Sequence, residues 1–300
     1  MPHATLIHHP GGGSASDTEL EQARSLLSQH FELDVRIVEE NTVPSQHAEQ
    51  ALKDGATLLI ASGGDGTVSS VASTMIGRTD LTLGILPRGT ANSISRHLDI
   101  PKELEQACAV ISAGHSRLID TARVNDQQMI LLTTIGVHAE AITEVDPELK
   151  RNYGAVAYVL EMADRMRDAD LFEVTLDANG QQVTCSANAV TVANLAPATS
   201  LLAQGTAAVV EDDGLLDVTV VAIRGLADAL STSFHLATRA LRQLPAEREN
   251  VGFFRTAEIR ISTKEPKRVM VDGEDATETP IVVRALPRSL RVLVPAPTPD

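Results

Sequence analysis

The sequence of 300 residues has few aromatic side chains, two cysteines and no long hydrophobic run. Aromatic residues make up only 2%, which argues against a surface that stacks nucleic-acid bases. Cys108 and Cys185 form neither a disulfide framework nor a metal-ligand spacing, so we expect a cytoplasmic protein. No apolar run approaches about 18 residues, and the N-terminus lacks a basic region, so neither a transmembrane helix nor a secretory signal is expected.

Basic side chains are also scarce. The formal net charge is -15, and the excess is evenly spread: residues 1–122 hold 8 basic and 15 acidic side chains, and residues 123–300 hold 17 and 25. Without a basic face, nucleic acid is disfavoured as a partner. Diffuse electrostatic adhesion to anionic lipid is disfavoured for the same reason.

The chain is long enough for two domains, and its patterns change near residue 120. Before that point apolar strands alternate with helices, which predicts a parallel sheet covered on both faces. Strands are expected at 4–8, 34–38, 57–61 and 81–87, and helices at 16–30, 44–55, 67–76, 90–99 and 101–114.

After that point strand patterns dominate, which predicts a mostly antiparallel sandwich or barrel. We therefore expect an α/β domain at 1–122 and a mostly antiparallel β-domain at 123–300. Strands are expected at 129–135, 171–176, 183–192, 216–223, 257–261, 268–271, 281–284 and 290–294, and helices at 153–167 and 226–244. The second of these helices has one apolar stripe, suited to core packing, a membrane surface or a lipid channel.

The stretch Ser-Gly-Gly-Asp-Gly-Thr at 62–67 follows the third expected strand. Ligands bind at the carboxyl ends of strands in open α/β sheets, and a helix N-terminus favours anions such as phosphate. Asp65 would repel bare phosphate, but it suits Mg²⁺ or a hydroxyl group. The alternative is an ordinary tight turn with a solvated aspartate. The spacing matches neither the usual phosphate loop nor the dinucleotide-binding fingerprint.

A second loop, Leu-Pro-Arg-Gly-Thr-Ala-Asn at 86–92, follows the next strand. Thr90 and Asn92 stand at an expected helix start, where an ordinary N-cap is the alternative interpretation. Two such loops after adjacent strands predict one cleft with two walls of hydrogen-bond donors.

These two loops resemble the diacylglycerol kinase catalytic domain, in its soluble bacterial lipid kinase branch. Further stretches agree in order along nearly the whole chain, among them 119–125, 133–142, 153–160, 211–221, 255–263, 271–274 and 286–295. Sphingosine and ceramide kinases are similar, and NAD kinases are more distant. The resemblance implies a phosphofructokinase-like α/β nucleotide-binding domain at 1–122 and a β-sandwich lipid-binding domain at 123–300. It also implies transfer of the γ-phosphoryl group of ATP to a lipid hydroxyl with Mg²⁺.

The resemblance also implies roles for particular residues. Glu274 matches the general base, Asp65 is the central acid of its motif, and Asp120 matches an aspartate near the site. A structural Mg²⁺ would take Asp213 and the backbone oxygens of Val210 and Leu215. By residue type alone, ordinary Asp-Gly turns would explain the acidic residues Glu274 and Asp213 without a catalytic or metal-binding role. The nucleotide contacts would come from Gly63, Gly64, Asp65, Gly66, Thr67, Val68, Ser69, Thr90 and Asn92.

Four positions depart from the family pattern. His9 replaces an asparagine, Val38 a threonine, Ser70 a glutamate and His138 an aspartate. We expect these four changes to affect ATP affinity more than the class of reaction. His8 and His9 are expected to be a surface pair.

Two alternatives to a lipid kinase remain open: an NAD kinase, and a nucleotide- or lipid-binding regulator that has lost catalysis. A lipid kinase would need a substrate with a free hydroxyl and transient, peripheral contact with a membrane. The sequence names neither the lipid nor the oligomeric state.

Overall fold

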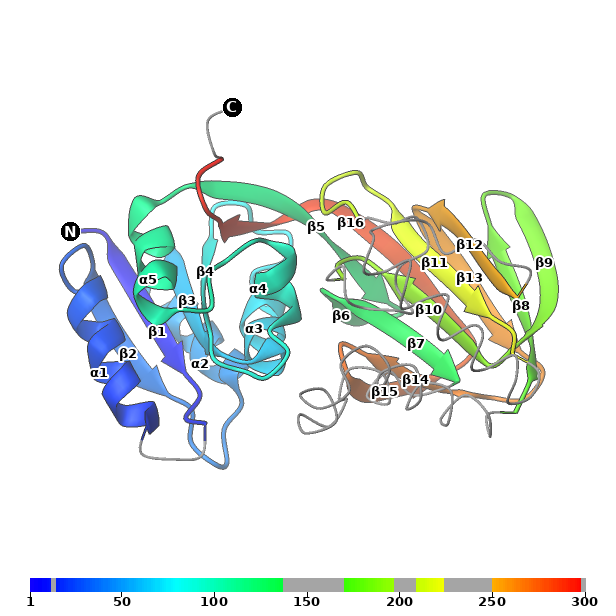
Figure 1. Ribbon diagram of the computed structural model, residues 1–300, viewed down its shortest axis with the longest axis horizontal. Helices are drawn as coiled ribbons and strands as arrows, with labels where there is room; N and C mark the ends of the chain where they lie inside the picture. Colours follow the sequence, from blue (N-terminus) through cyan, green and yellow to red (C-terminus); the bar gives the residue numbers. More distant parts are fainter. Residues whose placement is uncertain (12–14, 137–169, 197–208, 224–249, 298–300) are drawn as a thin grey trace, which may run out of the picture. The chain divides into compact units, whose positions relative to one another are not determined.

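The structure is a computed structural model that describes residues 1–11, 15–136, 170–196, 209–223 and 250–297. It divides into two compact units, Met1–Thr121 with Arg288–Asp300, and Ala122–Pro287 (Figure 1). The chain therefore passes between the units twice, and its last segment returns to the first unit. The helices expected at 153–167 and 226–244 and the departure at His138 lie outside the described residues.

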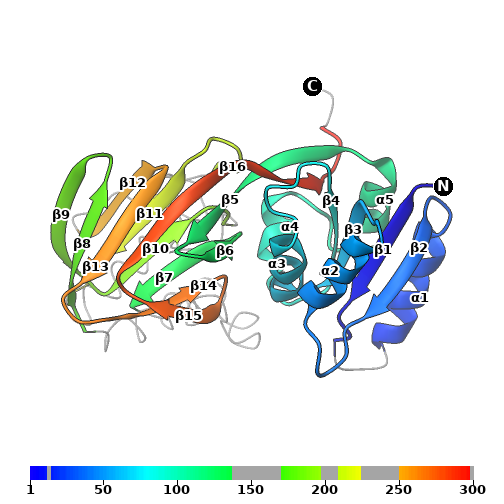
Figure 2. The same ribbon diagram turned by 180° about the vertical axis from the view of Figure 1, so that it is seen from behind.

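The first unit is built on a parallel sheet in the order β2 (Glu32–Ile37), β1 (His3–His8), β3 (Leu58–Gly63), β4 (Thr82–Pro87) and β16 (Ile281–Leu293). Figures 1 and 2, seen from opposite sides, show α1 and α5 on one face of this sheet and α2 and α3 on the other. Apolar side chains of α1 and α5 pack on the sheet as a core. The elements are β1 (His3–His8), α1 (Ala15–Leu27), β2 (Glu32–Ile37), α2 (Pro44–Lys53), β3 (Leu58–Gly63), α3 (Asp65–Ser73), β4 (Thr82–Pro87), α4 (Ser93–His97) and α5 (Leu104–Ala113).

The second unit consists of two largely antiparallel sheets. Strands of both sheets contribute to one apolar core, for example Val174 and Ile259 from one sheet and Val190 and Val218 from the other. One sheet holds β16 (Ile281–Leu293), β13 (Glu258–Thr263), β8 (Phe172–Ala178) and β9 (Gln181–Ala187), with β5 (Ser116–Val124) and β6 (Gln127–Met129); the other holds β12 (Val251–Thr256), β11 (Leu216–Val221), β10 (Ala189–Ala193), β7 (Leu132–Gly136), β14 (Arg268–Val271) and β15 (Glu274–Glu278).

The predicted fold class, an α/β domain followed by an antiparallel β-sandwich, is confirmed. Several element boundaries were wrong. The strand expected at 129–135 is two strands, β6 and β7, and the strand expected at 183–192 is β9 and β10, separated at Asn188. The buried Asn188 accepts the backbone N–H of Ile223 with its side chain, which fixes the point where the chain changes sheets. The two strands expected at 281–284 and 290–294 are one strand, β16.

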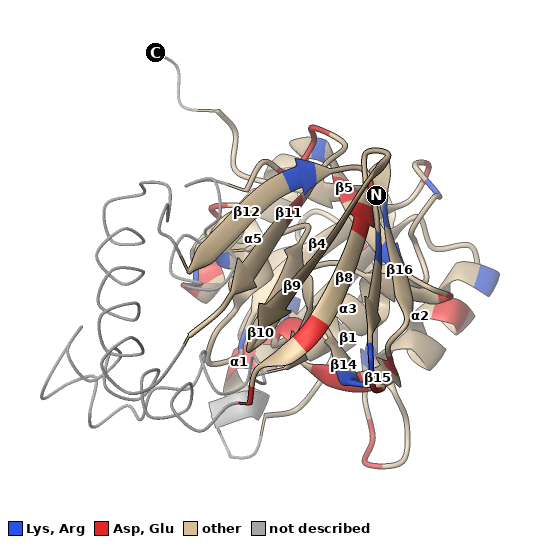
Figure 3. Cartoon of the chain, turned by 90° about the vertical axis from the view of Figure 1, so that its right-hand side faces the viewer, with Lys and Arg blue, Asp and Glu red and all other residues tan. Residues whose placement is uncertain are grey.

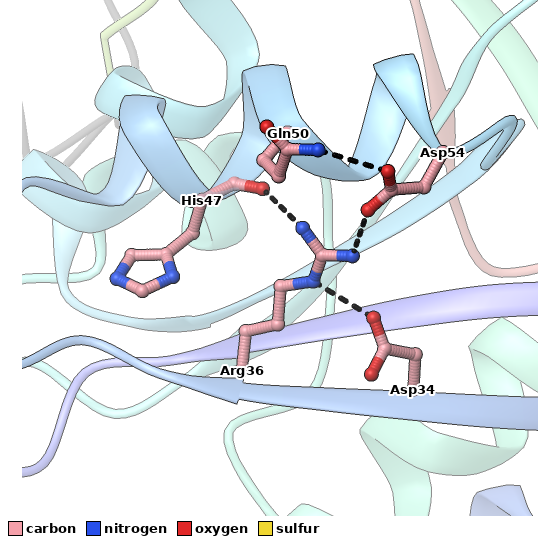
Figure 4. Close-up of polar contacts among 5 residues, drawn as sticks. All are labelled: Asp34, Arg36, His47, Gln50 and Asp54. Carbon is pink, nitrogen blue, oxygen red and sulfur yellow. Dashed lines mark hydrogen bonds and ion pairs between the residues drawn. The ribbon is translucent and has the colours of Figure 1, made fainter.

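An ion-pair network fastens α2 to β2 on the outside of the first unit (Figure 4). Arg36 donates from Nε to Asp34 and from Nη2 to Asp54, both at 2.7 Å, and from Nη1 to the backbone oxygen of His47 at 3.3 Å. Partial burial opposes the charge of Arg36, but its two carboxylate partners raise its pKa overall. The hydrogen bond from Arg36, together with one from Gln50, lowers the pKa of Asp54. The network therefore favours the charged form of both partners.

The acidic excess does not gather on one element of the described chain. Figure 3 shows acidic positions on strands, helices and turns, with basic positions among them. No described helix is long and apolar enough to cross a membrane.

Candidate functional site

The two glycine loops begin side by side in the first unit. β3 and β4 are parallel neighbours, and Gly63 lies opposite Pro87 at their carboxyl ends. The backbone N–H of Arg88 then donates to the oxygen of Gly63 at 2.9 Å. The structure therefore brings together the loops at 63–69 and 86–92, as their positions after adjacent strands predicted.

Three of the glycines are needed for this close packing. A Cβ on Gly89 would lie 2.6 Å from the Cα of Gly64, and a Cβ on Gly64 would lie 3.3 Å from the Cα of Gly89. A Cβ on Gly63 would overlap the side chain of Thr67. For these positions, packing within the protein is a sufficient reason for glycine.

Gly66 is different. It is exposed, its φ is not in the left-handed region, and a Cβ there would meet no atom within 4 Å. Packing and backbone conformation therefore leave the glycine unexplained. The first hydrogen bond of α3 runs from the N–H of Val68 to the oxygen of Gly64 at 3.0 Å. The N–H groups of Asp65, Gly66 and Thr67 precede it and form the positive end of the helix.

Asp65 joins the two loops. Its carboxylate accepts the backbone N–H of Ser93 at 2.8 Å and that of Ile94 at 3.0 Å, in the first turn of α4. Each of its oxygens thus already has one donor, a contact that sequence reasoning did not foresee. The structural role of Asp65 is to hold α4 against the start of α3. A role for Asp65 in Mg²⁺ or hydroxyl chemistry stays a prediction.

The remaining four expected nucleotide contacts have different surroundings. Asn92 is buried in the left-handed conformation and shapes its own loop, because its side chain exchanges hydrogen bonds of 2.7 Å with the N–H and oxygen of Gly89. Thr90 is exposed at the tip of that loop. Val68 is a core residue whose N–H is used within α3. Ser69 carries a buried Oγ that has no hydrogen-bond partner among the described residues.

Arg88 is a residue that sequence reasoning did not select. Its Nη2 lies 2.8 Å from Oε2 of Glu19 in α1, and its side chain is only 12% exposed. Its Nε is buried without a partner in the described part of the chain. A basic residue inside a loop expected to bind an anion was the available signal. The backbone of Arg88 thus contacts Gly63, while its guanidinium pairs with Glu19.

Three of the departures from the family pattern, His9, Val38 and Ser70, lie among the described residues of the first unit. His9 is exposed, but His8 is buried, so the expected surface pair was wrong. His8 Nδ1 lies 3.0 Å from Oγ of Ser62, at the ends of β1 and β3. Val38 is a core residue. Ser70 accepts the N–H of Ser45 at 3.0 Å and so caps the start of α2.

Asp120 also has a structural contact in the first unit. It is buried, and its Oδ1 accepts the N–H of Arg288 at 2.6 Å. Arg288 begins the segment that returns to this unit. Asp120 therefore helps to fasten the returning end of the chain.

Glu274 lies in the second unit, at the first position of β15, and it is exposed. It follows a turn in which Asp272 and Gly273 both have positive φ, at 51° and 91°. The Asp272 carboxylate accepts the N–H groups of Ile130, Leu131 and Leu132 at 2.9, 2.8 and 3.1 Å. These bonds explain why the expected strand at 129–135 is interrupted. They also make Asp272 the residue that fixes the turn before Glu274.

The expected structural Mg²⁺ site lies in the second unit as well, at a turn formed by residues 211–215. Oδ1 of Asp213 accepts the N–H of Leu215 at 2.9 Å, and Oδ2 accepts Nη1 of Arg255 at 3.1 Å. Val210 is exposed beside this turn. The described residues contain no group of three or more His, Cys, Asp or Glu side chains that could hold a metal ion. With a guanidinium already on its single carboxylate, this donor set as arranged does not fit Mg²⁺.

Comparison with known proteins agrees with this architecture. Residues 3–124 match the family described as the diacylglycerol kinase catalytic domain, and residues 132–294 match the YegS C-terminal NAD kinase beta sandwich-like domain. The chain belongs to this YegS and diacylglycerol kinase-like family of lipid kinases.

Individual relatives support the same assignment. A Synechocystis protein named only as uncharacterized is 36% identical over 97% of this chain and 70% of its own length. "Probable lipid kinase YegS" of Salmonella arizonae is 34% identical, but the match covers 55% of this chain and 56% of that protein. The chain thus matches about half the length of that named lipid kinase.

Solved structures show the fold. A diacylglycerol kinase structure from Bacillus anthracis matches with a TM-score of 0.78 at 25% identity, covering 98% of this chain and 97% of the other. Yeast NADH kinase in complex with NADH matches with a TM-score of 0.58 at 12% identity, covering 98% of this chain and 84% of the other. The second likeness concerns the fold alone.

Proposed function

We propose that the protein is an ATP- and Mg²⁺-dependent lipid kinase that transfers the γ-phosphoryl group to a lipid hydroxyl. The observation that carries this proposal is Gly66, where neither packing nor backbone conformation requires a glycine. A bare backbone at a helix N-terminus lets a phosphate oxygen approach the N–H groups directly. The membership in a lipid kinase family supplies the acceptor class.

The residues of the first unit fit a nucleotide. The N–H groups of Asp65, Gly66 and Thr67 would donate hydrogen bonds to phosphate oxygens, and the unpartnered Oγ of Ser69 is a further donor within the same helix. Arg88 would add positive charge to the loop wall. Mg²⁺ in complex with the nucleotide would neutralise phosphate charge, and phosphate oxygens are suitable ligands for it.

The chemistry assigned to the second unit is proton removal. In the proposed reaction the lipid hydroxyl oxygen forms a bond to the γ-phosphorus, the bond from that phosphorus to the β–γ bridging oxygen breaks, and ADP leaves. The hydroxyl proton passes to the carboxylate of Glu274, which acts as general base. Most of the remaining barrier is lowered by positioning and charge neutralisation. Because the acceptor is a lipid, the enzyme must contact a membrane transiently, from the cytoplasm.

Gly66→Ala tests the nucleotide site, because it should change folding and binding in opposite directions. In the first turn of α3, alanine should raise the free energy of unfolding by about 0.4–1 kcal/mol. Blocking one charge-assisted hydrogen bond to phosphate should cost about 1.5–3 kcal/mol, or roughly tenfold or more in the Kd for Mg·ATP. Calorimetric titration and thermal unfolding measure the two effects.

Gly252→Ala is the matched control, since Gly252 also lacks neighbours within 4 Å but lies on β12 in the second unit. It should leave the Kd unchanged. Unchanged Mg·ATP affinity in Gly66→Ala would contradict the proposed site. Phosphorylation of NAD but no lipid would favour the NAD kinase alternative, and bound Mg·ATP without any turnover would favour a regulator.

A further inference from the structure

The turn at 211–215 and the strand that follows it carry two carboxylates that share one arginine. Asp217 is on β11, and Arg255 lies directly opposite it on β12. Nε of Arg255 is 3.0 Å from Oδ1 of Asp217, and Nη1 is 3.1 Å from Oδ2 of Asp213. One guanidinium therefore bridges the turn and the strand.

Burial makes this bridge necessary. The side chain of Asp217 is 3% exposed, whereas those of Asp213 and Arg255 are 25% and 27% exposed. A carboxylate taken out of water to that degree needs a cation or several donors close by. Arg255 supplies the cation, and its planar guanidinium can bind both carboxylates at once.

A divalent ion at the same turn would meet this guanidinium. Mg²⁺ requires about six oxygen ligands at roughly 2.0–2.1 Å in nearly octahedral geometry. The Asp213 carboxylate would have to give up its contact with Arg255 or hold two cations side by side. Like charges at such separation repel, and most strongly where water is partly excluded.

We infer that Arg255 is the resident cation of this site, in the place of the structural Mg²⁺ that the family resemblance implies. The second unit should therefore fold and remain stable without a divalent metal. This inference concerns the stability of the unit, and it does not depend on the proposed lipid kinase activity or on Mg²⁺ bound with ATP.

Thermal unfolding without nucleotide, in EDTA and in millimolar Mg²⁺ at constant ionic strength, tests the inference. The wild-type melting temperature should be the same in both. Arg255→Ala in EDTA should lower it by about 6 °C or more, because it removes the cation that pairs with a buried carboxylate. Mg²⁺ should restore part of that loss in Arg255→Ala and none in the double variant Arg255→Ala with Asp213→Asn.

Arg284→Ala is the matched control. Arg284 also faces a carboxylate across two antiparallel strands, with its Nε 2.6 Å from Glu258, but that pair is 62% and 51% exposed. Its loss should lower the melting temperature by no more than about 4 °C, with no response to Mg²⁺.

Either of two results would overturn the inference. One is saturable stabilisation of the wild-type protein by Mg²⁺ that disappears in Asp213→Asn. The other is a folded Arg255→Ala variant that does not respond to Mg²⁺. If Arg255→Ala does not fold, Arg255→Lys is used in its place, because a single ammonium cannot bridge both carboxylates. Mg²⁺ should then raise the melting temperature of Arg255→Lys, by less than expected for Arg255→Ala.

Discussion

The Asp272→Asn substitution tests whether three hydrogen bonds hold the turn that presents Glu274. In the wild-type protein Oδ1 of Asp272 accepts from Leu131 and Leu132, and Oδ2 accepts from Ile130. Asparagine keeps one oxygen but replaces the other with an NH₂ group. At least one backbone N–H would then face another donor, and the remaining bonds would lose the assistance of the negative charge.

The expected magnitude follows from these bonds. A hydrogen bond to a charged group contributes about 1.5–3 kcal/mol, and an unsatisfied buried donor costs about 1–3 kcal/mol. We therefore expect a loss of about 2–4 kcal/mol in the free energy of unfolding of the second unit. For a unit of this size the melting temperature should fall by roughly 4–16 °C.

Thermal and urea unfolding provide the assay, with Asp275→Asn as the control. Asp275 lies on the same hairpin, but its contact with Arg268 is 3.5 Å long and both side chains are more than half exposed. That substitution should cost about 0–1 kcal/mol. Equal stability of Asp272→Asn and Asp275→Asn would refute the argument. If the Asp272→Asn variant is folded at low temperature but has a lower kcat than the wild type, the turn also positions Glu274 for the reaction.

Two further predictions concern titratable groups. The lowered pKa of Asp54 means that its ion pair stabilises the protein at pH values above the ordinary pKa of 3.8, and that this contribution is lost as the pH falls through the folded-state pKa. The difference in melting temperature between wild type and Asp54→Asn should therefore shrink below about pH 4. A difference that persists at lower pH would contradict the assignment. Burial, with a smaller effect from Glu105, raises the pKa of Cys108 to about 11. At pH 8 iodoacetamide should therefore modify Cys108 only after unfolding, whereas the less buried Cys185 should react first in the native protein. Peptide mass mapping would identify which cysteine has been modified.

Local sequence patterns predicted the architecture because most strands and helices of the first unit carry their own signal, although β5 was not predicted. The alternation of apolar strands with helices, and the glycine loops after two adjacent strands, are features of neighbouring residues. The two loops therefore came together as expected.

Contacts between distant residues were not predictable in the same way. Asp272 interrupts a strand about 140 positions earlier in the chain, and Arg255 meets Asp213 across 42 positions. Likewise the carboxylate of Asp65 binds α4, and Arg288 returns the chain to Asp120. Each depends on tertiary packing, which no local pattern encodes, and each changes the interpretation of a residue selected from its motif.

The central claim is phosphoryl transfer to a lipid, and the most direct test is a transfer assay with the purified full chain. ATP labelled at the γ-phosphate and Mg²⁺ would be supplied with mixed micelles of diacylglycerol, phosphatidylglycerol, sphingosine or ceramide, and with NAD in a parallel reaction. We predict label in at least one lipid and its loss in a folded Glu274→Gln variant. Label in NAD alone, or none in any acceptor while Mg·ATP binds, would contradict the claim.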